Sequence, residues 1–377
     1  MKRTFTFLLL TAILLPAAAN AAEAKLRFIK DVNYATTTEI GGTQLGGLSG
    51  IVFDKTTNKL IAISDDRGTR GEDDAFSPRL YTFDVVLNER ESTITPSGVR
   101  PLKILQERRE GFDRETTFPP LFLDPEGIAL GEDGSVFVSS EGLGPFMPPM
   151  VLRFSQDLVF QERLEVPNYF VPLKATFESG VQDNEAFEAL ALSADKQVLY
   201  TASEYPLGQD LPGSTDPKTY FSRIIAYRKT GADFKARNEY LYPLSDFKDP
   251  ESDLPNGLAD FLALPDGTIL TLERGFSKEL GNDIRLFQTS LQSATDVSGM
   301  EKISSSSHIR LAEKRLVLNL DTIVDQLDPK YRSLDNIEGI ALGPKLANGN
   351  DSLILVSDNN FSENQRTLFL IFELIQD

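Results

Sequence analysis

The chain has 377 residues, 41% of them hydrophobic and 25% charged, with no cysteine, no tryptophan and a single histidine. These counts exclude disulfides, cysteine-ligated zinc, iron–sulfur clusters, thiol nucleophiles and any zinc site built from several histidines. A formal net charge of −18 argues against a basic stripe for nucleic acid, so no nucleic-acid partner is expected. Carboxylates are abundant, at 56 Asp and Glu, and carboxylates favour hard cations as partners.

The first 21 residues have the pattern of a secretory signal peptide. Lys2 and Arg3 form a short positive region, residues 5–15 are almost entirely apolar, and Ala19-Asn20-Ala21 is a small-x-small cleavage site. Such a segment is too short for a permanent membrane span, and a buried N-terminal helix is the alternative. We therefore expect a secreted or periplasmic protein with no stable membrane anchor.

A pattern of paired strands then recurs at intervals of about 60 to 80 residues. Each copy has a small or acidic residue, a short apolar run, a turn, a second apolar run and a final acidic residue. The copies begin at Ser49, Glu126, Glu188, Asp260 and Glu338. Turn sequences such as Glu132-Asp133-Gly134 are typical of hairpins. A third apolar run follows in each copy, and a fourth follows in several.

Four antiparallel strands per repeat, with little periodic helix, predict the blades of an all-β propeller. We expect a single propeller domain over residues 22–377 with five four-stranded blades, and a degenerate sixth blade is left open. The last repeat reaches the C-terminus after three strands. Residues 25–29 are therefore expected to add the fourth strand, which would close the ring without a free edge. The expected oligomeric state is a monomer.

The acidic residues at the strand ends form the candidate site. In an antiparallel hairpin the start of the first strand lies beside the end of the second. Because the innermost strands of a propeller run parallel around the channel, all these residues should converge at one mouth of it. Of the ten positions, Ser49 is the one that is not acidic. The acids are Asp65, Glu126, Glu141, Glu188, Glu204, Asp260, Glu273, Glu338 and Asp358.

A bare ring of carboxylates is unfavourable, because two of them 4 Å apart repel by about 4 kcal/mol at an effective dielectric near 20. Protonation, arginines or bound hard cations can relieve the repulsion. Arg67, Arg274 and Arg366 are the arginines expected to do so, and they could also hold an anionic substrate group. Ca²⁺ is the expected ion, and all nine acids are candidate ligands. The alternative is that the acids cap loops and pair with the arginines.

Several stretches around these acids form a distinctive set. They are Gly47-Leu48-Ser49-Gly50, Ser64-Asp65-Asp66-Arg67-Gly68, Asp124-Pro125-Glu126-Gly127-Ile128, Leu272-Glu273-Arg274-Gly275 and Asn336-Ile337-Glu338-Gly339-Ile340. Together they resemble the phytase-like family of exported bacterial β-propellers, described as "esterase-like activity of phytase". The resemblance spans residues 40–374 and implies hydrolysis of a phosphomonoester or an ester.

Under the hydrolase hypothesis, the substrate is a small anionic or ester compound bound at the acidic mouth. The resident cation would polarise the ester, an unliganded carboxylate would act as general base, and arginines would stabilise developing charge. The candidate catalytic residues are Glu126, Glu188, Glu273, Glu338, Arg67 and Arg274. A serine esterase is disfavoured, because there is no G-x-S-x-G motif and His308 follows a run of serines.

The competing hypothesis is a non-catalytic, calcium-binding propeller that presents its loops to a ligand or protein partner. Three long inserts could form such a face or a lid over an active site: residues 68–77, 143–149 and 205–218. An open coordination position in an accessible cleft would favour the enzyme, whereas a fully ligated ion would favour the binding module.

Overall fold

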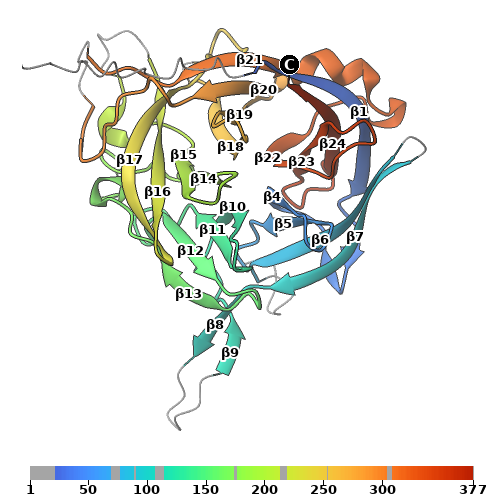
Figure 1. Cartoon of the computed structure of the whole chain (residues 1–377), viewed down its shortest axis with the longest axis horizontal. Helices are drawn as coiled ribbons and strands as arrows, with labels where there is room; N and C mark the ends of the chain where they lie inside the picture. The colour runs from blue at the N-terminus through green and yellow to red at the C-terminus, as the bar shows by residue number, and fades with distance from the viewer. Residues whose placement is uncertain are drawn as a thin grey trace, which may run out of the picture.

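The structure is a computed structural model that describes residues 22–68, 77–88, 91–106, 114–173, 176–212, 219–252, 254–303 and 308–376. Its described strands form a ring of sheets around a central axis (Figure 1). Five four-stranded antiparallel sheets make up the ring, which confirms the predicted five-bladed all-β propeller. No sixth blade occurs among the described residues. The predicted signal peptide, residues 1–21, lies outside them.

Each blade follows the same strand order, from an innermost strand at the axis to an outermost strand at the rim (Figure 1). Blade 1 contains β4 (Leu48–Asp54), β5 (Lys59–Ser64), β6 (Arg79–Leu87) and β7 (Ser92–Pro101). Blade 2 contains β10 (Pro125–Leu130), β11 (Val136–Ser140), β12 (Met150–Phe154) and β13 (Phe160–Arg163). Blade 3 contains β14 (Phe187–Leu192), β15 (Val198–Ser203), β16 (Phe221–Thr230) and β17 (Asp233–Pro243).

The remaining two blades bring the chain back to its start. Blade 4 contains β18 (Gly257–Ala263), β19 (Ile269–Ser277), β20 (Gly281–Ser290) and β21 (Glu313–Asn319). Blade 5 contains β22 (Asn336–Leu342), β23 (Asp351–Asp358), β24 (Arg366–Gln376) and β1 (Ala24–Ala35). Strand β1 pairs with β24 in antiparallel register from Ala24 opposite Gln376 to Ala35 opposite Arg366. The predicted closure by an N-terminal strand is therefore confirmed, and it covers the edge that β24 would otherwise expose.

Short elements connect the blades. Two small hairpins are formed by β2 (Glu39–Ile40) with β3 (Thr43–Gln44), and by β8 (Lys103–Gln106) with β9 (Arg114–Thr117). The second hairpin projects away from the ring (Figure 1). The described residues also include four 3₁₀ helices: η2 (Asn168–Phe170), η3 (Gly208–Asp210), η4 (Leu320–Gln326) and η5 (Pro329–Tyr331). In the described part of the chain, no helix has the length and hydrophobicity required to span a membrane.

The hydrophobic core is divided among the interfaces between neighbouring blades. Each of the five large clusters of buried apolar residues joins two adjacent sheets. Consecutive residues of one strand pack into the interfaces on opposite sides of the blade: Ala189 packs toward blade 4, and Leu190 packs toward blade 2. Because side chains alternate across a strand and both faces are covered, the inner strands are apolar along most of their length. This two-sided burial holds the innermost strands firmly around the axis, where the site lies.

Candidate functional site

The same irregularity in all five blades builds the site. Every innermost strand has a register shift close to its start, of the kind a β-bulge produces. In blades 2, 3 and 5 the shifted segment contains Glu126, Glu188 and Glu338, and these three side chains are buried. Ser49 is at the equivalent position of blade 1, as the sequence predicted.

The second strand of each hairpin supplies the other half of the ring. In blades 1, 2, 3 and 5 its last paired residue before the shift is a serine, and the next residue is an acid. These acids are Asp65, Glu141, Glu204 and Asp358. The backbone N–H of Glu141 donates to the Asp124 carbonyl and that of Glu204 to the Ala186 carbonyl, which extends the hairpin by one residue. The acids are thereby fixed beside the bulged residues.

Blade 4 differs from the prediction by one residue. Leu258 pairs with Glu273 just as Phe187 pairs with Ser203 in blade 3, so Glu273 occupies the serine position and Arg274 occupies the acid position. The residue equivalent to Glu188 is Ala259 rather than Asp260. A slip of one residue along a strand turns every side chain to the opposite face. Asp260 and Glu273 therefore do not join the ring.

Asp260 instead lies one step further along its strand, at the level of Ala189 in blade 3 and Gly339 in blade 5. Its carboxylate accepts hydrogen bonds from the backbone N–H groups of Ile340 at 3.0 Å and Phe261 at 2.8 Å, and it also bonds the Leu190 N–H. Burial raises the pKa of Asp260 well above its usual range. This carboxyl group thus bridges the inner strands of blades 3, 4 and 5.

Glu273 is fully buried between blades 3 and 4. Tyr242 donates a 2.6 Å hydrogen bond to its Oε1, Lys314 forms an ion pair with the same oxygen, and the Ser245 N–H donates to Oε2 at 3.2 Å. All three partners hold the carboxylate away from the channel. Glu273 is a structural ion-pair residue, for which the sequence motif alone gave no indication.

A further acid, Asp124, joins the site although the repeat pattern did not select it. One oxygen from each of Asp124, Glu126 and Glu141 lies within 4.8 Å of the other two. Asp124 Oδ2 forms an ion pair with Arg67 at 2.5 Å, whereas its Oδ1 is buried without a hydrogen-bond partner among the described residues. The signal was available in Asp124-Pro125-Glu126, but Asp124 precedes the strand and so has no counterpart in the repeat.

The carboxyl groups of the ring perturb one another. Burial, and then the charge of Glu188, raise the pKa of Glu126 well above its usual range, and burial followed by the charge of Asp124 does the same for Glu141. Burial raises the pKa of Asp124 to about 7 despite the opposing effect of Arg67. Burial likewise raises the pKa of Glu204 to about 7, against the effect of Arg274. Without a cation, the ring therefore retains protons near neutral pH.

Two of the three predicted arginines lie at the ring. Arg274 approaches Glu204 at 3.3 Å and Glu338 at 3.4 Å, and Arg67 pairs with Asp124. Arg366 does not join them: it forms an ion pair with Asp335 at 3.4 Å and donates to Asn33 at the outer strands of blade 5. Eight acids of the described ring thus face two arginines. The acids are Asp65, Asp124, Glu126, Glu141, Glu188, Glu204, Glu338 and Asp358.

A small pocket adjoins the ring. A pocket of about 20 Å³ lies beside the three-carboxylate cluster, lined by Arg67, Asp124, Glu141 and parts of residues 142–144 and 181–184. The predicted insert 143–149 contributes to this wall. Parts of the other two, residues 69–76 and 213–218, lie outside the described residues. His308 is exposed in a loop, as the sequence predicted.

The three-carboxylate cluster fits a hard divalent cation. Calcium–oxygen distances of about 2.3–2.6 Å place two ligands of one ion at most about 5 Å apart, and the oxygens of Asp124, Glu126 and Glu141 satisfy that limit. Asp124 Oδ1, which has no hydrogen-bond partner among the described residues, supplies an oxygen that is free to coordinate the ion. A pocket of about 20 Å³ has room for one small ion or water. The donor set is entirely oxygen, which suits Ca²⁺ better than soft transition metals.

Comparison with known proteins assigns the family. A profile described as "Phytase-like: Esterase-like activity of phytase" matches residues 43–361, and the chain therefore belongs to the phytase-like family. An uncharacterised secreted protein of Arthroderma benhamiae is 28% identical over 40% of this chain. That match covers 34% of the relative, so the chain spans about a third of the curated relative's length.

The solved structures are more distant. The periplasmic gluconolactonase of Pseudomonas aeruginosa is 13% identical, with 88% of this chain and 89% of that chain covered and a TM-score of 0.35. The RS223 β-xylosidase is 11% identical, with 90% and 94% covered and a TM-score of 0.44.

Proposed function

We propose that the protein is an exported, metal-dependent hydrolase that cleaves a phosphomonoester or an ester at the acidic mouth of its channel. The observation that carries this proposal is the buried cluster of Asp124, Glu126 and Glu141 beside Arg67. It combines a hard-cation donor set with a cationic group suited to a substrate anion. Family membership supports the hydrolytic reaction class.

The residues of the site divide into three roles. Asp124, Glu126 and Glu141 would hold Ca²⁺, which when bound supplies a Lewis acid for a phosphoryl or carbonyl oxygen. Arg67 leaves 35% of its side chain exposed, so its guanidinium can bind a substrate anion while one edge stays paired with Asp124. Glu204 has a pKa of about 7 and is suited to transfer a proton near neutral pH.

The other predicted catalytic residues take different places in this proposal. Glu188 and Glu338 complete the ring and adjust its charge, and Arg274 lies between Glu338 and Glu204. This proposal gives Glu273 no catalytic role, because its carboxylate is held by Lys314 and Tyr242.

A panel of substrates tests the proposal. The protein would be incubated with p-nitrophenyl phosphate, p-nitrophenyl esters, phytate and lactones, each with added calcium and with a chelator. Turnover that is lost on chelation and in Glu126→Gln, but kept in the exposed control Glu363→Gln, is the expected result. Turnover that is unaffected by chelation and by Glu126→Gln would contradict the proposal.

A second function is favoured by one specific observation. Glu126 and Glu141 are 7% and 6% exposed, and the adjoining pocket is only about 20 Å³. A site this enclosed is also suited to a structural ion, which would make the protein a non-catalytic calcium-binding propeller. Tight calcium binding by calorimetry, with no turnover of any substrate in the panel, would establish this alternative.

A further inference from the structure

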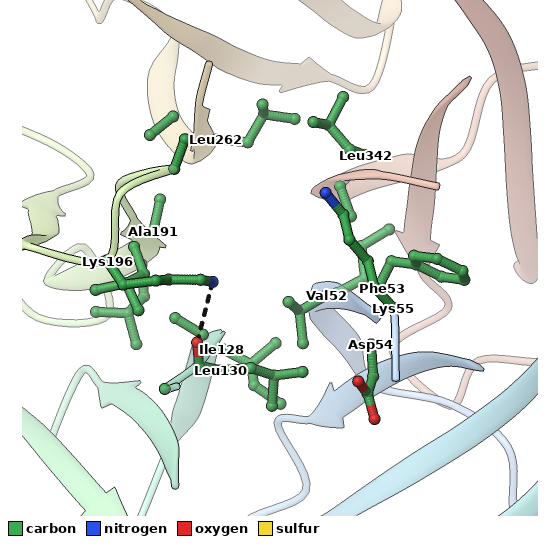
Figure 2. Close-up of a pocket in the computed structure, with 18 of the residues that line it drawn as sticks. Val52, Phe53, Asp54, Lys55, Ile128, Leu130, Ala191, Lys196, Leu262 and Leu342 are labelled. Carbon is green, nitrogen blue, oxygen red and sulfur yellow. Dashed lines mark hydrogen bonds between the residues drawn. The ribbon is translucent and has the colours of Figure 1, made fainter. Parts of the chain in front are cut away.

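A second cavity opens at the other end of the central channel. It has a volume of about 390 Å³ and is lined by the later residues of all five innermost strands (Figure 2). Along each strand these residues follow the bulge, so the cavity and the acid ring lie at opposite ends of the hairpins. Asp260 lies between the two levels, bonded to the N–H of Ile340 and adjacent to Phe261, which lines the cavity.

The wall of this cavity is apolar. Val52, Ile128, Ala191, Leu262 and Leu342 come from five different blades and surround the same space (Figure 2). The volume lies within the range of about 300–1,000 Å³ that is typical of small-molecule sites. An apolar wall that is open to solvent favours an apolar ligand group, because burial of that group removes hydrocarbon surface from water.

The mouth of the cavity carries charged residues of both signs, two lysines and two acids. Lys55 and Lys196 extend over the mouth from the turns of blades 1 and 3 (Figure 2). Lys196 Nζ donates to the Leu130 carbonyl at 3.2 Å, and neither lysine forms an ion pair with a described carboxylate. Burial, and then the charge of Lys55, lower the pKa of Lys196. Two ammonium groups therefore share one mouth, and the carboxylate of Glu132 also acts on Lys196.

The acids at the same mouth are engaged elsewhere. Asp54 points away from the cavity (Figure 2) and accepts hydrogen bonds from the Thr56 N–H at 2.9 Å and the Thr57 hydroxyl at 2.6 Å. Glu132 forms an ion pair with Lys229 at 2.7 Å. The lysines are consequently left to interact with an anion from solution.

We propose that this cavity binds an amphipathic carboxylate, with the apolar tail inside the channel and the carboxylate between Lys55 and Lys196. Both parts of such a ligand have a complementary partner: the tail has the five-sided apolar wall, and the anion has two ammonium groups. A neutral ligand of the same length would lack the second set of contacts. The site is separate from the acid ring and does not depend on the proposed hydrolase activity.

Calorimetry with octanoate tests the proposal on the full protein. Saturable one-to-one binding is expected, and octanol and octylamine should bind at least tenfold more weakly. Lys196→Gln and Lys55→Gln should each weaken octanoate binding by about tenfold or more, the effect of removing one charge-assisted contact. Ala191→Phe, which fills the cavity, should abolish binding while the circular dichroism spectrum stays unchanged.

A matched control separates this site from general attraction to lysines. Lys345 is in the β22–β23 turn on the same face, but it pairs with Asp351 at 2.9 Å and does not line the cavity. Lys345→Gln should leave octanoate binding unchanged. The proposal is overturned if octanoate does not bind saturably, if octanol binds equally well, or if Lys345→Gln weakens binding as much as Lys196→Gln.

Discussion

The acid ring predicts an unusual dependence of stability on pH. When calcium is chelated and the pH is raised from 5 to 8, the ring must lose protons that burial makes it retain. Asp124 and Glu204 both have pKa values of about 7 in the folded protein, compared with ordinary values of 3.8 and 4.5. Between these limits the folded state binds more protons than the unfolded state, so the free energy of unfolding decreases as the pH rises.

The size of the effect follows from these shifts. One pKa unit corresponds to 1.36 kcal/mol, and between pH 5 and pH 8 each of the two carboxyls accounts for about 2.5 kcal/mol of lost stability. The two together give a decrease on the order of 5 kcal/mol, a large fraction of the 5–15 kcal/mol typical of a folded domain. Calcium bound to the folded state opposes the decrease, by about 2.7 kcal/mol at a concentration 100 times its dissociation constant.

Urea denaturation at pH 5, 6, 7 and 8, with chelator and with calcium, measures this behaviour. With chelator, the free energy of unfolding should fall steadily as the pH rises, and calcium should restore stability most at pH 8. Glu126→Gln should flatten the dependence, because it removes a charge that interacts with Asp124. If the chelated protein instead became more stable from pH 5 to pH 8, the carboxyls would not be buried together as described.

Three further results are expected. Arg274→Gln should lower the free energy of unfolding at pH 8 by about 3–5 kcal/mol, the usual effect of leaving a buried partner charge uncompensated. The double variant with Glu338→Gln should recover part of this loss. No recovery would mean that Arg274 and Glu338 do not interact. Gly257→Ala should lower the rate of hydrolysis, because the new Cβ would lie 2.3 Å from Oε1 of Glu204, the group proposed to transfer a proton, and an unchanged rate would argue against that role. His308→Ala should leave the rate of hydrolysis unchanged, since a measurable loss would indicate imidazole chemistry.

The repeat and the mouth of the channel could be predicted because they depend on local patterns. Alternating strands separated by hairpin turns indicate blades, and acids at equivalent strand ends must lie at the same end of their hairpins. Glu126 and Glu338 are predicted ring residues that the structure does place there. The closure by β1 was predictable for a related reason, since a sheet with three strands leaves an edge that needs a partner.

Blade 4 shows where the pattern was insufficient. Asp260-Phe261-Leu262-Ala263-Leu264 has the same acid-x-apolar-Ala-Leu pattern as three of the other repeats, yet the register places Ala259, not Asp260, at the ring. An apolar run fits the repeat pattern almost equally well when it is shifted by one residue. Only pairing with the adjacent strand determines which register the run adopts. The same shift puts Arg274 where the other blades have an acid.

The sequence by itself determined the all-β repeat, its closure by the N-terminal strand and the acidic character of one channel mouth, because each of these depends on the order and spacing of residues along the chain. Only the tertiary structure decided that Asp124 approaches Glu126 and Glu141, that Glu273 pairs with Lys314, and that two lysines share the opposite mouth. These arrangements depend on strand register and on packing between blades, which join residues far apart in the chain.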